Sequence, residues 1–254
     1  MRKRQKFVLT ALLLSVGLTL IQFIPLEFRY ISIAFLTAMT WVLSAWSLKE
    51  GLSGLEWITV LMPMTLFTGG VGFFYILLPG SWIAKLIIVV LFAIGQYALL
   101  LTGNIFSVAA IRTIALLRAA QAVGFLMTLL TGFFVFNTVL SFRHGFWWNA
   151  PFVFLGSLLL LLPALWSVRL EVKLTRELVM HSLTLSALLA MMSVAISIWP
   201  ISLAVASLFL TTMLYTYLGI TQHHFSERLF KRTAWEYIMV GVIVLVTMLL
   251  TSGA

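Results

Sequence analysis

Residues 104–121, NIFSVAAIRTIALLRAAQ, carry two arginines, Arg112 and Arg118, that lie between long apolar runs near the middle of the chain. An apolar run precedes this stretch at residues 83–103, and another follows it up to residue 141. Each run matches the roughly 20 apolar residues that a helix needs to cross the hydrocarbon core of a bilayer. The stretch therefore predicts a polar joint between two transmembrane helices.

The composition of the chain extends this prediction to its full length. Hydrophobic residues make up 62% of the 254 residues and charged residues only 9%, whereas a soluble domain carries roughly a quarter charged residues. Apolar runs recur from end to end and leave no stretch for a soluble domain. We predict an all-α, polytopic transmembrane helical bundle that forms a single domain, residues 1–254.

Nine spans account for the apolar runs, and eight spans are the alternative. Prolines mark three of the turns, at Pro25, Pro79 and Pro200, because a helix cannot continue through these positions. The predicted spans are residues 7–25, 29–47, 57–78, 83–103, 119–141, 152–168, 180–199, 201–220 and 236–252. The first four spans occupy residues 1–103, a cytoplasmic interfacial connector residues 104–118, and the last five spans residues 119–254.

The distribution of Lys and Arg supports nine spans, because cytoplasmic loops of membrane proteins carry an excess of these residues. With the N-terminus cytoplasmic and the C-terminus outside, only Arg29, Lys85 and Arg143 fall outside. The cations on the cytoplasmic side are then Arg2, Lys3, Arg4, Lys6, Lys49, Arg112, Arg118, Arg169, Lys173, Arg176, Arg228, Lys231 and Arg232. Merging two spans would invert every later loop and destroy this asymmetry.

The net charge of +9 comes from cations scattered singly between spans. Nucleic-acid binding requires cations gathered on one folded face, so we expect no nucleic-acid partner. Anionic lipid headgroups are the expected partner instead, because cations beside transmembrane helices attract them. A membrane-protein partner or a homo-oligomer is a further possibility that the sequence leaves open.

The sequence contains few residues in patterns that bind a metal or cofactor or that catalyse a reaction. There is no cysteine and no aspartate, which removes thiolate ligands and aspartate-based sites. His223 and His224 are adjacent, so on a helix their side chains point about 100° apart, and no HExxH spacing occurs. No GxSxG elbow is present either. We predict no metal, no cofactor and no catalytic residues.

Residues 104–121 form the first candidate site. Plotted as one helix at 100° per residue, Asn104, Ser107, Arg118 and Gln121 fall on one stripe, and Arg112 lies roughly 120° from Arg118. One interpretation is an interfacial helix whose arginines extend to lipid phosphates. The other is a cleft in which the arginines bind a lipid phosphate or carboxylate.

The second candidate site is a cytoplasmic collar at residues 221–236, TQHHFSERLFKRTAWE, just before the last span. An amphipathic segment of this kind binds anionic lipid at the headgroup layer. Its candidate residues are His223, His224, Glu227, Arg228, Lys231 and Arg232. If the protein were a lipid-headgroup enzyme, these residues and the neighbouring cytoplasmic arginines would have to supply its active site.

Several patterns indicate how the helices pack. The third span holds Pro63 and a group of three glycines, which predicts a kink and a close helix neighbour. A seam of small residues in the seventh span predicts another packing face, with Ser182, Ser186, Ala190, Ser193 and Ser197 on one side. Residues 168–178 alternate with a period of two, typical of a strand, although an irregular interfacial connector is the preferred interpretation.

Tryptophans concentrate near the predicted helix ends, where amphipathic rings favour the headgroup layer. These anchors are Trp46, Trp57, Trp82, Trp147, Trp148, Trp166, Trp199 and Trp235. The cluster at residues 146–149 could alternatively form an aromatic platform for a sugar or lipid headgroup.

The run from Tyr97 to Phe125, YALLLTGNIFSVAAIRTIALLRAAQAVGF, resembles a segment of a family of uncharacterised multi-pass bacterial membrane proteins. The shared feature is an Asn-Ile-Phe start that leads into an Arg-Thr-Ile segment. The resemblance covers about a ninth of the chain and implies no activity. It implies a multi-pass protein of the bacterial inner (plasma) membrane.

The sequence leads to three functional hypotheses. The first is a non-enzymatic accessory or scaffold component that binds membrane partners or anionic lipid. The second is a facilitative carrier or channel for a small solute, with Gln96, Tyr97 and Asn137 along the path. The third is a lipid-headgroup enzyme at the cytoplasmic interface. The spans contain no clear ionisable group, which disfavours transport coupled to protons or sodium.

Overall fold

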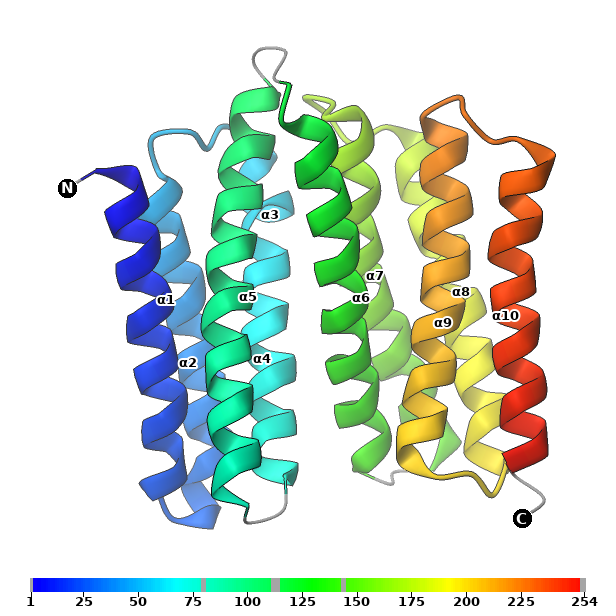
Figure 1. Ribbon diagram of the computed structural model, residues 1–254, viewed down its shortest axis with the longest axis horizontal. Coiled ribbons are helices and arrows are strands. Elements are labelled where there is room, and N and C mark those ends of the chain that lie inside the picture. The colour runs from blue at the N-terminus through cyan, green and yellow to red at the C-terminus, as the bar shows by residue number, and fades with distance from the viewer. Residues whose placement is uncertain (1, 79–80, 111–114, 143–144, 252–254) are drawn as a thin grey trace. The chain divides into compact units, whose positions relative to one another are not determined.

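The computed structural model describes residues 2–78, 81–110, 115–142 and 145–251, and within them every regular element is a helix (Figure 1). Eleven helical elements follow one another through these ranges. They are α1 (Lys3–Leu20), η1 (Ile21–Phe23), α2 (Leu26–Leu48), α3 (Glu56–Thr59), α4 (Leu61–Leu77), α5 (Trp82–Ala109), α6 (Leu117–Ser141), α7 (Phe146–Arg169), α8 (Arg176–Ile198), α9 (Leu203–Phe225) and α10 (Lys231–Thr251).

Among the described residues, nine helices are long and apolar enough to cross a membrane, with α1 and η1 forming one of them and α3 and α4 another. The predicted class, an all-α polytopic protein with nine spans, is confirmed. The helices extend beyond the predicted spans at several ends. The longest is α5, which runs for 28 residues and continues through Asn104 and Ser107 to Ala109.

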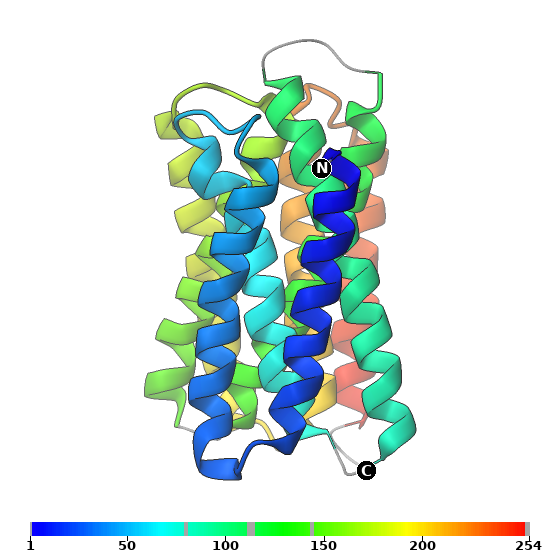
Figure 2. The ribbon, with the colours of Figure 1, turned by 90° about the vertical axis from the view of Figure 1, so that its left-hand side faces the viewer.

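The chain divides into two compact units, residues 1–127 and 128–254, with the boundary inside α6. In unit 1, α2 packs on α1 and α4, and α5 packs on the same two helices, so that the four spans close a ring (Figures 1 and 2). Lys6 at the start of α1 bonds to Glu50 after α2, 3.1 Å away. Beyond the other end of α1, Gln22 accepts from Tyr75 of α4, 3.0 Å away. Successive spans of unit 1 therefore run in opposite directions.

The third span is interrupted, as its proline predicted. α3 ends at Thr59 and α4 begins at Leu61. Pro63 has no N–H to donate to the carbonyl of Thr59, and its ring crowds the preceding turn, which explains a break at this position. Further along α4, a Cβ on Gly72 would lie 2.9 Å from a methyl group of Ile33 on α2. The glycines thus allow α2 and α4 to approach closely, as in other membrane helix pairs.

In unit 2, α8 packs most extensively on α7, and α10 packs on α9. The seam of small residues in α8 is confirmed as a packing face, because Ser182, Ser186 and Ser193 are fully buried. Asn149 at the start of α7 donates to Ser197 near the end of α8, 3.0 Å away. These two helices are therefore antiparallel and joined along their length.

The alternating segment at residues 168–178 is an irregular connector in the structure. Val168 and Arg169 complete α7, and α8 starts at Arg176. Leu170 has the left-handed backbone conformation, with φ 53° and ψ 41°, and its N–H donates to the Trp166 carbonyl. This conformation ends the helix and turns the chain back toward it. No strand pairing occurs in the described residues, so the preferred interpretation holds.

Seven of the eight predicted tryptophan anchors are exposed near helix ends, but the prediction for Trp166 is wrong. Trp166 is only 1% exposed, and its indole N–H donates to the carbonyl of Glu171, 2.9 Å away. The ring fills the interior of unit 2 because the connector after α7 folds back over it. Its position one turn from a helix end gave the same sequence signal as a true anchor.

Candidate functional site

The polar stripe predicted along residues 104–121 does not form on one helix. Ala110, Ala115 and Leu116 lie in turns, so Asn104 and Ser107 belong to the end of α5, and Arg118 and Gln121 to the start of α6. A plot that assumes one continuous helix therefore gives the wrong relative directions for these side chains. Arg112 lies outside the described residues. As ligand-binding candidates, all five remain predictions.

Ser107 has a packing role. It is fully buried, and its hydroxyl donates to the Asn104 carbonyl, 3.1 Å away. A Cβ on Gly51, in the connector after α2, would lie 2.9 Å from the Ser107 hydroxyl oxygen. Only a glycine fits so closely, so this contact fixes the connector against the end of α5. Arg118, by contrast, is exposed at the start of α6.

The two histidines of the collar point to different neighbours. His223 bonds through Nδ1 to the Gly219 carbonyl, 2.9 Å away, and its ring lies 5.6 Å from that of Tyr237 on α10. His224 is exposed and lies 6.2 Å, ring to ring, from His181 on α8. The divergence follows from their adjacent positions on α9. No group of three metal-ligating side chains occurs in the part of the chain that the structure describes.

The remaining collar residues form the junction between α9 and α10. Glu227 adopts a left-handed backbone, with φ 55°, just after α9. Arg228 and Lys231 are exposed, and neither makes an ion pair with any described residue. Among the described residues, Arg232 pairs only with Glu236 on its own helix, at 3.3 Å, and its side chain is 91% exposed. An exposed pair of this kind contributes little, so this junction presents three accessible cations.

Arg169 joins three helices at the same end of unit 2, a role that the sequence did not reveal. One nitrogen of its guanidinium lies 2.7 Å from Glu177 and 3.8 Å from Glu171. Its Nε donates to the Phe225 carbonyl at 3.5 Å, and the guanidinium stands 4.5 Å above the Phe225 ring. Arg169 is thus a packing residue between α7, α8 and α9. No repeat or spacing signals this, because its partners come from three separate segments.

The polar amides assigned to a carrier path lie in separate units and hold helices together. Gln96 of α5 donates to the Met64 carbonyl of α4, 3.0 Å away. Asn137 of α6 donates to the hydroxyl of Ser207 on α9, 3.3 Å away. Both amides are buried. Hydrogen bonds between transmembrane helices of this kind stabilise their association.

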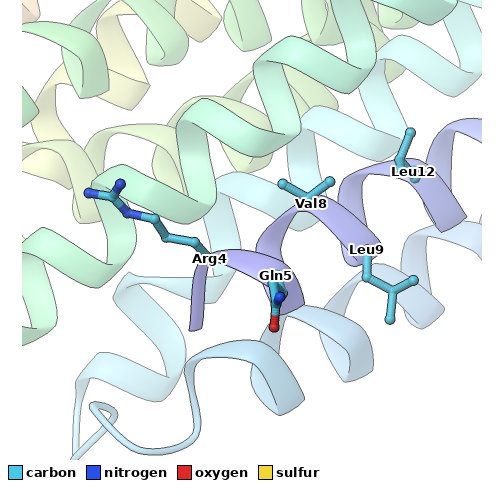
Figure 3. A pocket seen from close by; sticks show the side chains of 5 residues that line it. All are labelled: Arg4, Gln5, Val8, Leu9 and Leu12. Carbon is cyan, nitrogen blue, oxygen red and sulfur yellow. The ribbon is translucent and has the colours of Figure 1, made fainter. Parts of the chain in front are cut away.

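An open hollow of about 460 Å³ lies along α1 in unit 1 (Figure 3). Its lining combines the apolar side chains of Val8, Leu9 and Leu12 with Gln5 and the exposed cation Arg4. Arg4 extends away from the helix at one end of the row (Figure 3). The sequence marks Arg4 only as one of the predicted cytoplasmic cations, because a hollow depends on shape and not on residue order.

A cluster at the opposite face of the first turn ties α1 to the chain after α2. Lys6 and Lys3 lie 3.1 and 3.5 Å from the Glu50 carboxylate, and the Lys6 ammonium stands 5.6 Å from the centre of the Trp46 ring. The hydrogen bond and positive charge of Lys6 lower the pKa of Glu50 below its ordinary value of 4.5, and Lys3 adds a smaller effect.

The lowered pKa of Glu50 predicts that its contact with Lys6 and Lys3 depends on pH. The contact is present above pH 4.5 and is lost as the pH falls through the lower pKa that Glu50 has in the folded protein. Hydrogen exchange of Gln5 and Lys6, whose N–H groups donate to the Arg2 carbonyl, is therefore expected to accelerate below that point once corrected for its intrinsic pH dependence. In the variant Glu50→Gln, exchange should already be fast and show no such step. An identical pH profile in the two proteins would contradict the assignment.

These features define a class of protein: a multi-pass helical membrane protein whose charged side chains, among the described residues, lie at or near helix ends. No family model, curated protein or solved structure matches the chain.

Proposed function

We propose that the protein is a non-enzymatic component of the bacterial inner membrane that binds anionic phospholipid on its cytoplasmic side. The hollow along α1 carries this proposal. Its volume of about 460 Å³ falls within the roughly 300–1,000 Å³ of small-molecule sites. An acyl chain fits against Val8, Leu9 and Leu12, and Arg4 then meets the phosphate.

The positions of these residues along α1 support binding of a lipid acyl chain and its phosphate at the same site. Arg4 lies in the first turn of α1, and Leu12 lies two turns further along the same helix. With the N-terminus cytoplasmic, Arg4 reaches the headgroup layer and the apolar side chains face hydrocarbon. Arg4 makes no ion pair with a described residue, so its charge is available to a lipid. Neither a catalytic base nor a nucleophile is needed for this role.

The exposed cations at the start of α6 and between α9 and α10 support the same role. Arg118, Arg228 and Lys231 have no carboxylate partner among the residues that the structure describes. Cations close to the anionic inner leaflet each contribute about 1 kcal/mol of attraction. The proposal thus assigns the protein one lipid site of defined shape along α1. It also assigns several exposed cations that attract anionic lipid without forming a defined site.

The test is to extract the protein in mild detergent and to identify retained lipids by native mass spectrometry. We expect phosphatidylglycerol to be retained over phosphatidylethanolamine. Arg4→Gln should reduce retention about fivefold, as loss of about 1 kcal/mol implies. Lys49→Gln, which removes another exposed cation of unit 1 away from the hollow, is the matched control for general charge attraction and should have a smaller effect than Arg4→Gln.

A second variant separates the hollow from simple charge attraction. Val8 is 45% exposed, so Val8→Trp fills the hollow without burying the larger ring in the bundle. The proposal predicts that Val8→Trp lowers lipid retention although every charge remains. If Val8→Trp retained as much phosphatidylglycerol as the parent protein, or if Arg4→Gln and Lys49→Gln were equivalent, the site would be refuted.

A further inference from the structure

One face of α2 carries four hydroxyl groups, from Thr37, Thr40, Ser44 and Ser47. Three of the four donate to the carbonyl four residues earlier, at 2.8 to 2.9 Å. Ser44 differs from them, because its fully buried hydroxyl has no hydrogen-bond partner among the described residues. Its proton is therefore available to a group that does not belong to α2.

The Gln96 side chain of α5 presents the complementary group. Gln96 is fully buried, and its Nε2 donates to the Met64 carbonyl and to the Thr68 hydroxyl. A backbone carbonyl can only accept, so the amide has to direct its nitrogen toward Met64. Its Oε1 then points the other way, and no described residue donates to it. Among the described residues of unit 1, the Ser44 hydroxyl and the Gln96 Oε1 are thus the buried side-chain atoms that lack a hydrogen-bond partner.

These two groups lie on helices that face each other across the ring. α2 and α5 each pack on both α1 and α4, and they also touch each other. Thr40, one turn from Ser44, approaches the Thr68 hydroxyl at 3.0 Å, and Thr68 accepts from Gln96. A short polar connection thus already reaches from the Ser44 face of α2 to the Gln96 amide, although Ser44 and Gln96 make no direct hydrogen bond.

We propose that a water molecule is bound inside unit 1, where it accepts from Ser44 and donates to Gln96 Oε1. The large majority of buried polar side-chain atoms in folded proteins are paired, and buried water supplies the partner at many positions where side chains do not. A water molecule both accepts and donates, which the two free atoms require of a single ligand.

A neutral ligand fits this position better than a cation does. Both free atoms are uncharged, and the buried carboxylate of unit 1, Glu56, is engaged by the N–H and the hydroxyl of Ser53 at the start of α3. A cation inside a bundle without a free carboxylate would remain uncompensated in a medium of low dielectric constant. The site is therefore a hydration site that links α2 to α5.

A density map of the full-length protein in a lipid nanodisc, at a resolution that shows ordered water, tests the proposal directly. We expect a peak within hydrogen-bonding distance of both Ser44 Oγ and Gln96 Oε1. A map without this peak, or one in which a side chain donates to Gln96 Oε1, would overturn the proposal.

Unfolding equilibria provide a second test. A bridging water makes Ser44→Ala destabilising, by about threefold in the unfolding equilibrium, as for other hydrogen bonds between membrane helices. An unpaired hydroxyl predicts the opposite sign, since its removal relieves a buried polar group. In a Gln96→Leu background the destabilisation by Ser44→Ala should be lost or reversed, because the hydroxyl then has no bridged partner. Ser15→Ala is the control, because the buried Ser15 hydroxyl bonds only within α1. A stabilising Ser44→Ala, or an equal effect in both backgrounds, would overturn the water bridge.

Discussion

Replacing Arg228, Lys231 and Arg232 together by glutamine is expected to weaken the association of anionic phospholipid with the α9–α10 junction by on the order of 100-fold. Each cation close to the membrane surface contributes about 1 kcal/mol to this attraction, and the three act on the same leaflet. None of the three has a strong partner in the part of the chain that the structure describes, since the Arg232–Glu236 pair is exposed. The loss should therefore appear in lipid binding and not in folding.

The measurement is competition between phosphatidylglycerol and phosphatidylcholine for the protein surface, with a labelled lipid in nanodiscs of defined composition. A charge-conserving triple variant, Arg228→Lys with Lys231→Arg and Arg232→Lys, is the matched control and should bind lipid like the parent protein. Raising the salt concentration should reduce the difference, because exposed charges are screened. Equal selectivity in the glutamine variant and the parent would contradict a role for these cations.

Trp166→Ala is expected to destabilise unit 2 by about 3–5 kcal/mol, the range for removing a buried aromatic side chain from a core. The ring is among the largest fully buried side chains, at 1% exposure. Its N–H also holds the Glu171 carbonyl, which places the Glu171 carboxylate 3.8 Å from Arg169. Loss of the ring should therefore loosen the junction of α7, α8 and α9 as well as the core.

Unfolding in a graded mixture of detergents, followed by circular dichroism, measures this effect. Trp235→Ala is the control, because Trp235 lies on α10 with 65% of its surface exposed and behaves as an interfacial anchor. Trp166→Phe should fall between the two, since it keeps an aromatic ring but loses the hydrogen bond and part of the buried volume. If the two alanine variants cost the same, the burial of Trp166 would not determine the stability of unit 2.

The spans were predictable because the bilayer imposes a simple requirement on sequence. Every backbone polar group in hydrocarbon has to be paired within the chain, so about 20 consecutive apolar residues have to form a helix. That requirement located all nine helices. The ends were less exact, because Asn104 and Ser107 are polar and yet continue α5. A helix that extends past the hydrocarbon core no longer needs apolar residues, and hydropathy then carries no information on its end.

The local geometry of the candidate sites was less predictable. The stripe of residues 104–121 was predicted on the assumption of one continuous helix. In the structure, α5 ends at Ala109 and α6 begins at Leu117. Trp166 and Arg169 looked like an interfacial anchor and a loose cytoplasmic cation. Their true partners, Glu171, Glu177 and Phe225, depend on how three helix ends converge. Such convergence is a property of tertiary packing, and a single sequence contains no periodicity that reports it.

The different directions of the two collar histidines were predictable from the sequence. The histidines at 223 and 224 were expected to diverge because adjacent helical residues point in different directions, and their neighbours, Tyr237 and His181, are indeed different. The prediction succeeded because it relied on geometry within one helix. The hollow along α1, by contrast, depends on the shape of an exposed surface, and the role proposed for Arg4 follows only from that shape.

The account depends most directly on the chain crossing the membrane nine times with its cationic connectors on the cytoplasmic side. Because the chain has no cysteine, a maleimide labels only the cysteine that a single substitution introduces. Ser53, Ser81, Ser202 and Ser226 are exposed serines in connectors or at helix ends. In intact cells, a membrane-impermeant maleimide should label Ser81→Cys and Ser202→Cys, and should reach Ser53→Cys and Ser226→Cys only after permeabilisation. Labelling of Ser202→Cys and Ser226→Cys from the same side would contradict the account, because these two positions flank α9.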